Sequence, residues 1–461
     1  MSLADRIGRS LFVAMAVGLG WGIRGDFGHL VGAMYPGAAL GLALASVSGQ
    51  RSLFRWMPIL AALSGLAIGS GGMMSYALLH GYAQSDTLVN YAYGFFTLFL
   101  QGSAWGTFGG ALIGLMLERE PLRTGEWLGL IGSVLLGGWL TSFLVVDVLG
   151  FQINPPRNNG SIAFMGAALA QLIWLACNHK PIGLRGGVLG YVGFGLGMAG
   201  GRLLGNVANV LQGPSGSTIN HWNVMETSCG FIAGFIYCFG MVGRAYPEPP
   251  EDENIPLASA YGILYVLGVI PLWHRLNRIQ PVGTKLADWA KSLKSYGYSD
   301  PEGLARTVLW LIDGVCALGF VGAALWMVIH FRRRQRWAML PVLWLSGTML
   351  LYQNLNALYF FYPHRSNYIN MHNVFWAMFG LMALYAALAR PRPVPVPEDP
   401  GTELEPRFSW AGWLAGAVAI LAIVVFLAGY VNGEQTMKTA NTRWPAWSWQ
   451  QGPFPGRAAR P

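Results

Sequence analysis

Residues 410–431 read WAGWLAGAVAILAIVVFLAGYV and contain no charged side chain. As an α-helix, a segment of this length extends over roughly 33 Å, about the thickness of the hydrocarbon core of a bilayer. The segment lacks the alternation of apolar and polar residues that marks a half-buried strand. Because lipid offers no hydrogen bonds to the backbone, the sequence predicts a transmembrane helix here.

Similar apolar stretches recur along the whole chain, and we expect about thirteen spans, within a range of about twelve to fourteen. The predicted spans are residues 10–23, 29–48, 57–79, 94–117, 127–149, 161–178, 185–210, 224–243, 257–273, 307–331, 338–362, 371–389 and 410–431. The expected fold class is therefore all-α, a polytopic integral membrane helical bundle.

The composition agrees with this fold class. Of the 461 residues, 53% are hydrophobic and 11% are charged, whereas a soluble domain carries about a quarter charged residues. So few charges would not cover the surface of a water-soluble protein of this size. The net charge of +9 does not indicate nucleic-acid binding, because the basic residues are spread over alternate loops rather than clustered.

The distribution of Lys and Arg predicts the orientation of the chain in the membrane. Alternate short loops carry basic residues, including the run at 332–334, whereas the loops at 81–93 and 213–223 carry none. Under the positive-inside rule, the N-terminus is cytoplasmic and the C-terminus extracytoplasmic. We expect a protein of the cytoplasmic (inner) membrane, with the lipid bilayer as its immediate partner.

Glycine is abundant inside the predicted spans, with 62 glycines in the chain. The pattern G-x-[GA]-x-G-x-x-G occurs at 18–25, 65–72, 102–109 and 193–200, and its spacing lets helix backbones approach closely. Residues 17–25 and 192–200 agree at five of nine positions, with an offset of 175 residues. This offset favours two parallel six-helix repeats plus one accessory C-terminal helix. Glycine-driven packing without a duplication explains the same pattern.

Two proline-rich linkers divide the chain. The first transmembrane half covers 1–244, an acidic linker 245–256, and a second transmembrane portion 257–389, which includes an external amphipathic segment at 280–305. A cytoplasmic linker at 390–409 precedes the last transmembrane helix at 410–431, and an external tryptophan-rich tail covers 432–461. The last span lacks a strongly polar side chain, so we expect an accessory helix that faces lipid all round.

Polar side chains gather at the predicted outer ends of the spans, which indicates an extracytoplasmic working face. Ionisable groups within a span are costly and usually mark function. The candidate substrate-binding residues are Arg24, Asp26, His29, Arg202, Asn206, Glu226, Asp313, Asn354, Asn356, Arg365 and His372.

Three of these residues have more than one interpretation. Either glycines break the first span and draw Arg24 into a cavity, or Arg24 is an interfacial arginine whose charged end reaches water. Glu226, near the start of its span, has an alternative role as a helix-capping acid. Asp313 needs a partner inside its span, and Arg24 and Arg202 are the candidates.

The sequence predicts no metal site and no cofactor. The four cysteines form no CxxC pair, and no histidine pair has HExxH spacing. The motif GLGWGIRG at 18–25 resembles a dinucleotide-binding turn, but it lies in an apolar span without a preceding strand. Neither metal ligation nor dinucleotide binding is therefore expected.

Two functions fit these observations. The first is a secondary transporter or permease for a small polar or anionic solute, which paired halves and an intramembrane acid favour. The loop SGQRSLFRW at 48–56 differs from the corresponding pattern of the major facilitator superfamily. The alternative is a glycosyl- or acyl-transferase acting on a lipid-linked or periplasmic substrate. The layout of spans, with Asp26 in the first external link, resembles that of multispan glycosyltransferases that use polyprenyl-phosphate sugars. The sequence leaves open whether the chain is an enzyme.

Overall fold

The computed structural model describes most of the chain, and every regular element in the described part is a helix. The described residues are 1–27, 29–71, 76–154, 160–215, 219–242, 244–247, 255–270, 272, 282–330, 338–356, 371–389 and 408–433. The all-α class predicted from the apolar runs is confirmed. Helices are expected from such runs, because each backbone N–H finds its acceptor within the same segment.

The helices follow one another with short connections. In chain order they are α1 (Leu3–Ile23), the 3₁₀ turn η1 (Arg24–Phe27), α2 (His29–Val47), α3 (Arg51–Gly71), α4 (Ala77–Ala83), α5 (Leu88–Leu115), α6 (Thr124–Ser142), the π-helical turn η2 (Phe143–Val148), α7 (Gly160–Cys177), α8 (Pro181–Ser215) and α9 (His221–Met241). The second part contains α10 (Ile255–Leu264), the π-helical turn η3 (Tyr265–Val269), α12 (Val282–Ser295), α13 (Pro301–His330), α14 (Leu340–Asn356), α15 (Met371–Leu388) and α16 (Trp410–Gly433).

Eight helices in the described residues are long and apolar enough to cross a bilayer. They are Leu53–Gly71, Thr124–Val148, Gly160–Cys177, Pro181–Leu211, His221–Met241, Pro301–Met327, Met371–Leu388 and Trp410–Asn432. Two shorter apolar helices are Gly32–Val47 and Pro256–Val269. All thirteen predicted spans overlap described helices. The structure thus fits a helical membrane protein, and the count of thirteen spans remains a prediction.

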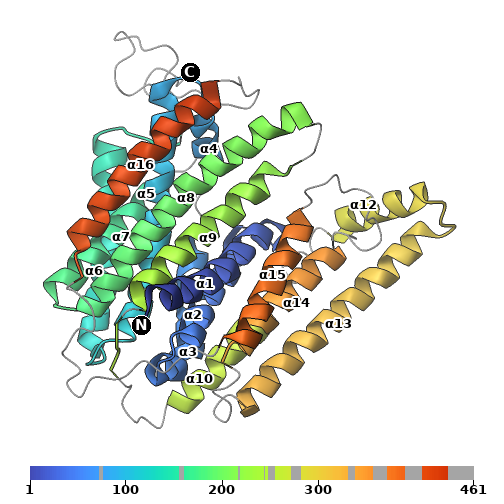
Figure 1. The fold of residues 1–461 in the computed structure, drawn as a ribbon, viewed down its shortest axis with the longest axis horizontal. Helices are drawn as coiled ribbons and strands as arrows, with labels where there is room; N and C mark the ends of the chain where they lie inside the picture. Colours follow the sequence, from blue (N-terminus) through green and yellow to red (C-terminus); the bar gives the residue numbers. More distant parts are fainter. Residues whose placement is uncertain are drawn as a thin grey trace.

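Helix α1 lies between the two parts of the bundle (Figure 1). It packs against α2 and α9 from the first part and against α14 and α15 from the second. Helices α5 and α8 pack against each other beyond α9, and α16 lies along both of them. Helices α12 and α13 lie on the opposite side of the molecule (Figure 1). The C-terminal helix is therefore in contact with the first part of the chain.

The N-terminal half of α1 is held by a buried arginine. Arg9 is 1% exposed and donates hydrogen bonds to the carbonyl oxygens of Val47 and Ser48, at 2.8 and 2.7 Å. Its guanidinium also forms an ion pair with Asp5 at 2.9 Å. These bonds satisfy the carbonyl groups that the end of α2 leaves without helical partners.

Glycines form the contact between α5 and α8. Gly102, Gly106, Gly110 and Gly114 recur at every fourth position of α5, and a Cβ atom at any of them would collide with backbone carbonyl oxygens between residues 182 and 194 of α8. The copy of the predicted glycine motif at 102–109 contributes Gly102 and Gly106 to this interface, whereas Gly193, Gly197 and Gly200 of the copy at 193–200 face α9. Close backbone approach is the expected role of glycine in a membrane bundle, where helices gain little from burying apolar surface.

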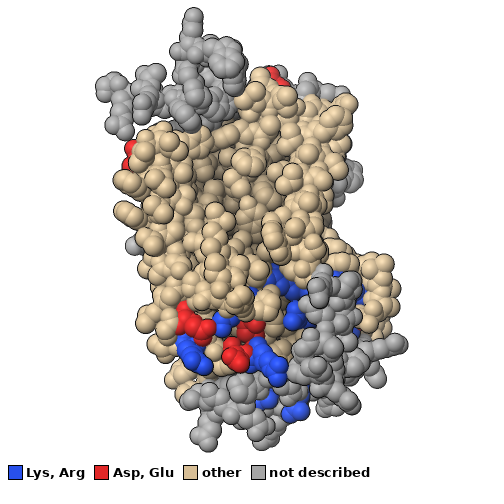
Figure 2. All heavy atoms as spheres, turned by 90° about the vertical axis from the view of Figure 1, so that its left-hand side faces the viewer, with Lys and Arg blue, Asp and Glu red and all other residues tan. Residues whose placement is uncertain are grey.

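Charged residues gather at one end of the face shown in Figure 2, below a broad band without charged side chains. Glu118, in the turn after α5, accepts hydrogen bonds from the backbone N–H groups of Ile182 and Gly183, both at 2.8 Å. Burial raises the pKa of the Glu118 carboxyl, while these two hydrogen bonds act in the opposite direction. Lys180 forms an ion pair with Glu126 of α6 at 2.6 Å. The first turn of α8 is thereby tied to its neighbours.

Candidate functional site

Arg24 lies inside the bundle, directly after the last residue of α1. The helix runs without interruption through Gly18, Gly20 and Gly22, and Arg24 begins the turn η1 with an exposure of 2%. The glycines therefore do not break the helix, and the arginine does not extend to the surface. The first interpretation drawn from the sequence is therefore right to place Arg24 inside the protein and wrong to break the helix at its glycines. The second interpretation, an arginine whose charged end reaches water, is wrong. Gly20 is required where α1 crosses Pro36 of α2, because a Cβ would lie 2.9 Å from the proline Cα.

The partner of Arg24 is Glu226 of α9. Arg24 Nη2 lies 2.8 Å from Glu226 Oε1, and the Tyr76 hydroxyl donates to the same oxygen at 3.3 Å. Helix α9 begins at His221 and is capped by Asn220, whose side chain accepts from the backbone N–H groups of Trp222 and Asn223. Glu226 is thus outside the first turn, so its role is the ion pair and not the helix cap considered from the sequence.

Aromatic rings surround this ion pair. The Arg24 guanidinium lies 4.6 Å from the ring centre of Trp21 and 5.2 Å from that of Tyr76. The indole of Trp21 stacks on that of Trp105, with centroids 5.5 Å apart and planes 7° apart. Tyr76 meets Trp105 edge-on at 5.6 Å. Cation–π contact of this kind stabilises a guanidinium that has been removed from water.

A second buried arginine lies at the other end of the aromatic group. Arg202 of α8 is fully buried, donates from Nε to Asn206 Oδ1 at 2.7 Å, and lies 5.8 Å from the ring centre of Trp222. The Asn206 amide donates to Asn432 Oδ1 at 2.9 Å and to the carbonyl oxygen of Ala83 at 3.1 Å. Arg202 is therefore oriented through residues of α4 and α16.

His80 of α4 connects the two arginines. Its ring meets Tyr76 at 5.2 Å and Trp222 at 5.3 Å, both edge-on. The rings thus form a continuous series from Trp21 and Trp105 through Tyr76 and His80 to Trp222. We call these five side chains, together with Arg24, Arg202 and Glu226, the arginine–aromatic site. Helices α1, α5, α8 and α9 and the short α4 with its N-cap contribute to it.

Many polar atoms of this site have no hydrogen-bond partner among the described residues. They are Arg24 Nε and Nη1, Arg202 Nη1 and Nη2, both ring nitrogens of His80, and the indole nitrogens of Trp21 and Trp105. Thr227 Oγ1 next to Glu226, and both amide atoms of Gln101 one turn before Trp105, are also without a partner in the described part. Arginine and tryptophan can only donate hydrogen bonds. The site thus holds a surplus of buried donors, each costly while unsatisfied.

The structure brings together four of the predicted site residues, namely Arg24, Arg202, Asn206 and Glu226. The side chains of Asp26, His29 and Asn356, and the whole of Arg365, lie outside the described residues. What these four residues contribute stays a prediction.

Asp313 and Asn354 belong to a second group, on α13 to α15. Asp313 accepts a hydrogen bond from the Tyr352 hydroxyl at 3.4 Å, and Asn354 accepts one from Trp376 Nε1 at 3.4 Å. The ion pair of Arg24 is made with Glu226, and not with Asp313 as considered from the sequence. His372 lies in the first turn of α15, one turn before Trp376, with its ring edge-on to Phe375.

Sequence reasoning missed His80 and the aromatic members of the site. One signal was present: Trp21 and Trp105 occupy the same position in their copies of the glycine motif, at 18–25 and 102–109. Their stacking shows that this shared position points to one place in the bundle. Tyr76 and His80 stand in an otherwise apolar stretch, where single polar residues usually indicate ordinary core positions.

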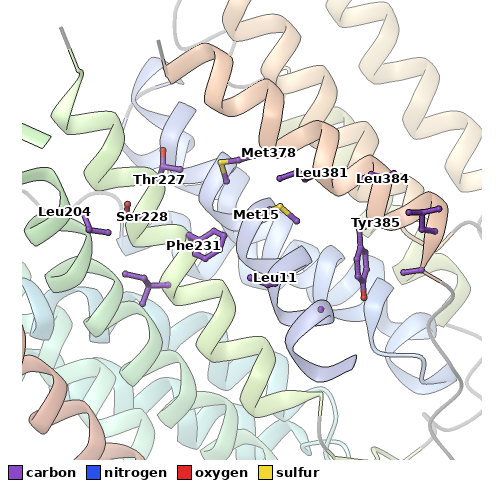
Figure 3. Close-up of a pocket in the computed structure, with 14 residues that line it drawn as sticks. Leu11, Met15, Leu204, Thr227, Ser228, Phe231, Met378, Leu381, Leu384 and Tyr385 are labelled. Atoms are coloured by element: carbon purple, nitrogen blue, oxygen red, sulfur yellow. The ribbon is translucent and has the colours of Figure 1, made fainter. Parts of the chain in front are cut away.

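An apolar groove of about 830 Å³ lies beside α1, between α9 and α15 (Figure 3). Leu11 and Met15 of α1, Phe231 of α9, and Leu381 and Tyr385 of α15 line it. Thr227, the residue after Glu226, lies at one end with Met378 nearby (Figure 3).

Comparison with protein-family models, with curated proteins and with solved structures finds no match for this chain. The fold itself defines the class to which the site belongs, an all-helical protein with several helices suited to a bilayer. A function must therefore be argued from the geometry of the arginine–aromatic site.

Proposed function

We propose that this chain is a secondary transporter or permease that binds a small anionic solute at the arginine–aromatic site. The observation that carries the proposal is the surplus of buried donors on Arg24 and Arg202. An anion with carboxylate or phosphate oxygens offers several acceptors to such guanidinium groups. Among the described side chains of the site, two guanidinium groups face a single carboxylate, that of Glu226. A bound anion would therefore reduce the buried positive charge.

The position of the site favours transport. The site lies in the interior where α1, α4, α5, α8 and α9 meet, and solute sites of transporters lie at such helix junctions inside the bilayer. We further propose an inner-membrane location, a cytoplasmic N-terminus and a site that opens to the extracytoplasmic side, because basic loops alternate along the chain. Two parallel six-helix repeats remain part of this proposal, supported by the shared motif of residues 17–25 and 192–200.

The proposal is tested by anion-dependent stabilisation of the purified protein in detergent. A ligand that binds only the folded state raises its thermal midpoint in a concentration-dependent manner. We expect acetate, glycolate or inorganic phosphate at millimolar concentration to raise the midpoint by roughly 2 °C or more. Arg24→Gln and Arg202→Gln should abolish this rise, whereas Arg306→Gln, at an arginine 62% exposed, should leave it intact.

Uptake of the same anion into proteoliposomes should then depend on Arg24 and Arg202. If no anion raises the midpoint of the wild-type protein, or if both arginine variants respond as the wild type does, the proposal is wrong.

A second candidate function is favoured by the groove in Figure 3. A lipid chain lying between α1, α9 and α15 would bring its polar group towards Thr227 and thus towards the Arg24–Glu226 pair. This arrangement would suit a glycosyl- or acyl-transferase with a lipid-linked substrate. Turnover of a lipid-linked donor by detergent-solubilised protein, without net solute uptake into vesicles, would decide for the transferase.

A further inference from the structure

We infer that His80 determines the specificity of the arginine–aromatic site by selecting anions that carry a hydroxyl group beside the carboxylate. The inference rests on the proposed function, since it requires an anion at Arg24 and Arg202. His80 is fully buried, and neither ring nitrogen has a hydrogen-bond partner among the described residues. A buried imidazole with two unsatisfied nitrogens is a costly feature for a fold to retain.

The surroundings of His80 determine its charge. The ring lies between Tyr76 and Trp222. Burial of the ring is the main factor that disfavours a positive charge on it, and the guanidinium groups of Arg202 and Arg24 add repulsion. His221, the neighbouring histidine, acts in the same direction. A third buried cation at this place would be strongly unfavourable, so the imidazole is neutral.

A neutral imidazole presents one donor nitrogen and one acceptor nitrogen. The free guanidinium and indole groups around it only donate. A simple carboxylate only accepts hydrogen bonds, so it would satisfy the arginines and leave the acceptor nitrogen of His80 without a partner. A hydroxyl group on the carbon next to the carboxylate supplies that missing donor without adding a positive charge. The geometry therefore points to small 2-hydroxy carboxylates as the substrate class.

Acetate and glycolate form a matched pair of probes, because they differ only by one hydroxyl group and both carry one negative charge. We expect the wild-type protein to bind glycolate about tenfold more tightly than acetate, since a site built to bond a hydroxyl discriminates against the analogue that lacks it. Dissociation constants are measured from the concentration dependence of the thermal midpoint in detergent.

His80→Leu should lose the preference for glycolate over acetate, so that the ratio of the two dissociation constants falls to about one. His80→Asn, whose amide retains a donor and an acceptor, should restore part of the preference for glycolate. That result would show that the site selects glycolate through hydrogen bonds and does not require the imidazole ring. Arg24→Gln should abolish the midpoint rise that either anion produces. These variants separate the role of His80 from that of the arginines.

The outcomes distinguish the two proposals. If the wild type prefers glycolate to acetate and Arg24→Gln responds to neither anion, but His80→Leu keeps the wild-type preference, His80 is not the selecting residue and the anion site stands. Equal binding of both anions by the wild type would likewise exclude selection by His80 and leave the anion site in place. If the wild-type protein binds neither anion, the proposed function and this inference both fail.

Discussion

Arg24 and Glu226 form an ion pair that is almost fully removed from water, with side-chain exposures of 2% and 12%. Such a pair adds little net stability compared with apolar residues, because desolvation of both charges offsets their attraction. Removing one partner is different, since the remaining charge is then buried without compensation. At the scale of single residues, the pair therefore defines a place where charge must be balanced, by the protein itself or by a ligand.

Glu226→Gln should lower the free energy of unfolding by roughly 3 kcal/mol, because Arg24 loses its counter-charge. The double variant Arg24→Gln/Glu226→Gln should lose less than the sum of the two single variants. Thermal or denaturant unfolding in detergent gives the free energies of unfolding of the wild type, the two single variants and the double variant. Glu302→Gln breaks the exposed pair with Arg306 and should cost less than about 1 kcal/mol. Strict additivity in the cycle would contradict the role assigned to the pair.

Helix α8 is the element on which the site depends most. It carries Arg202 and Asn206, its first turn is capped by Glu118, and it packs closely on α5 through glycines. The same interface sets the position of Trp105, which stands on α5 next to Gly106. A larger distance between α5 and α8 would thus displace Trp105 at one end of the aromatic series and Arg202, next to Trp222, at the other.

Gly106→Ala should destabilise the protein by about 1–3 kcal/mol, the usual cost of overpacking, because the new Cβ would meet the carbonyl group of Gly190. Gly132→Ala is the matched control: Gly132 lies on α6 with open space around its Cβ position. The control should be neutral or stabilising by up to about 1 kcal/mol, since alanine favours the helix. Equal effects of the two substitutions on thermal unfolding would show that the α5–α8 contact is not tight.

At the scale of the whole molecule, the last helix is joined to the first part of the chain. Most of α16 presents apolar side chains at the surface, but the helix packs on α5 and α8, so the expectation that it faces lipid all round is wrong. Near its end, however, Asn432 is 1% exposed and donates to the carbonyl oxygens of Ala83 and Ser85, both at 2.9 Å. Asn432 also accepts from Asn206, which holds Arg202.

Asn432→Ala should therefore weaken anion binding at a distance, as well as lower stability by about 1–3 kcal/mol, because Asn206 and two carbonyl groups lose a buried partner. The anion-dependent rise of the thermal midpoint in this variant provides the measurement. Asn178→Ala, which removes a side-chain bond within the end of α7, is a suitable control. If the variant unfolds at a lower temperature but binds anions with unchanged affinity, α16 does not contribute to anion binding.

The helical architecture could be predicted from the sequence because long apolar runs leave the backbone no alternative in lipid. The polar residues of the site were found by the same logic, since a polar group inside an apolar run is costly. The pairing of Arg24 with Glu226 could not be predicted, because the two residues are 202 positions apart and meet only through the packing of α1 on α9. His80 could not be predicted for a different reason. Its importance lies in two ring nitrogens without a hydrogen-bond partner among the described residues, which no sequence pattern reveals.

Two buried arginines, Arg9 within α1 and Arg24 directly after its last residue, have a mechanical consequence. Arg9 ties one part of the helix to the end of α2, and Arg24 ties the opposite end to α9. Because α1 is held at both ends, it cannot tilt relative to α2 and α9. We therefore expect α1, α2 and α9 to move as one rigid body if the protein undergoes a transport cycle. The relative motion would then occur at the groove, where α1 and α9 face α15 across weak apolar contacts, and where a sliding surface needs no hydrogen bonds to be broken.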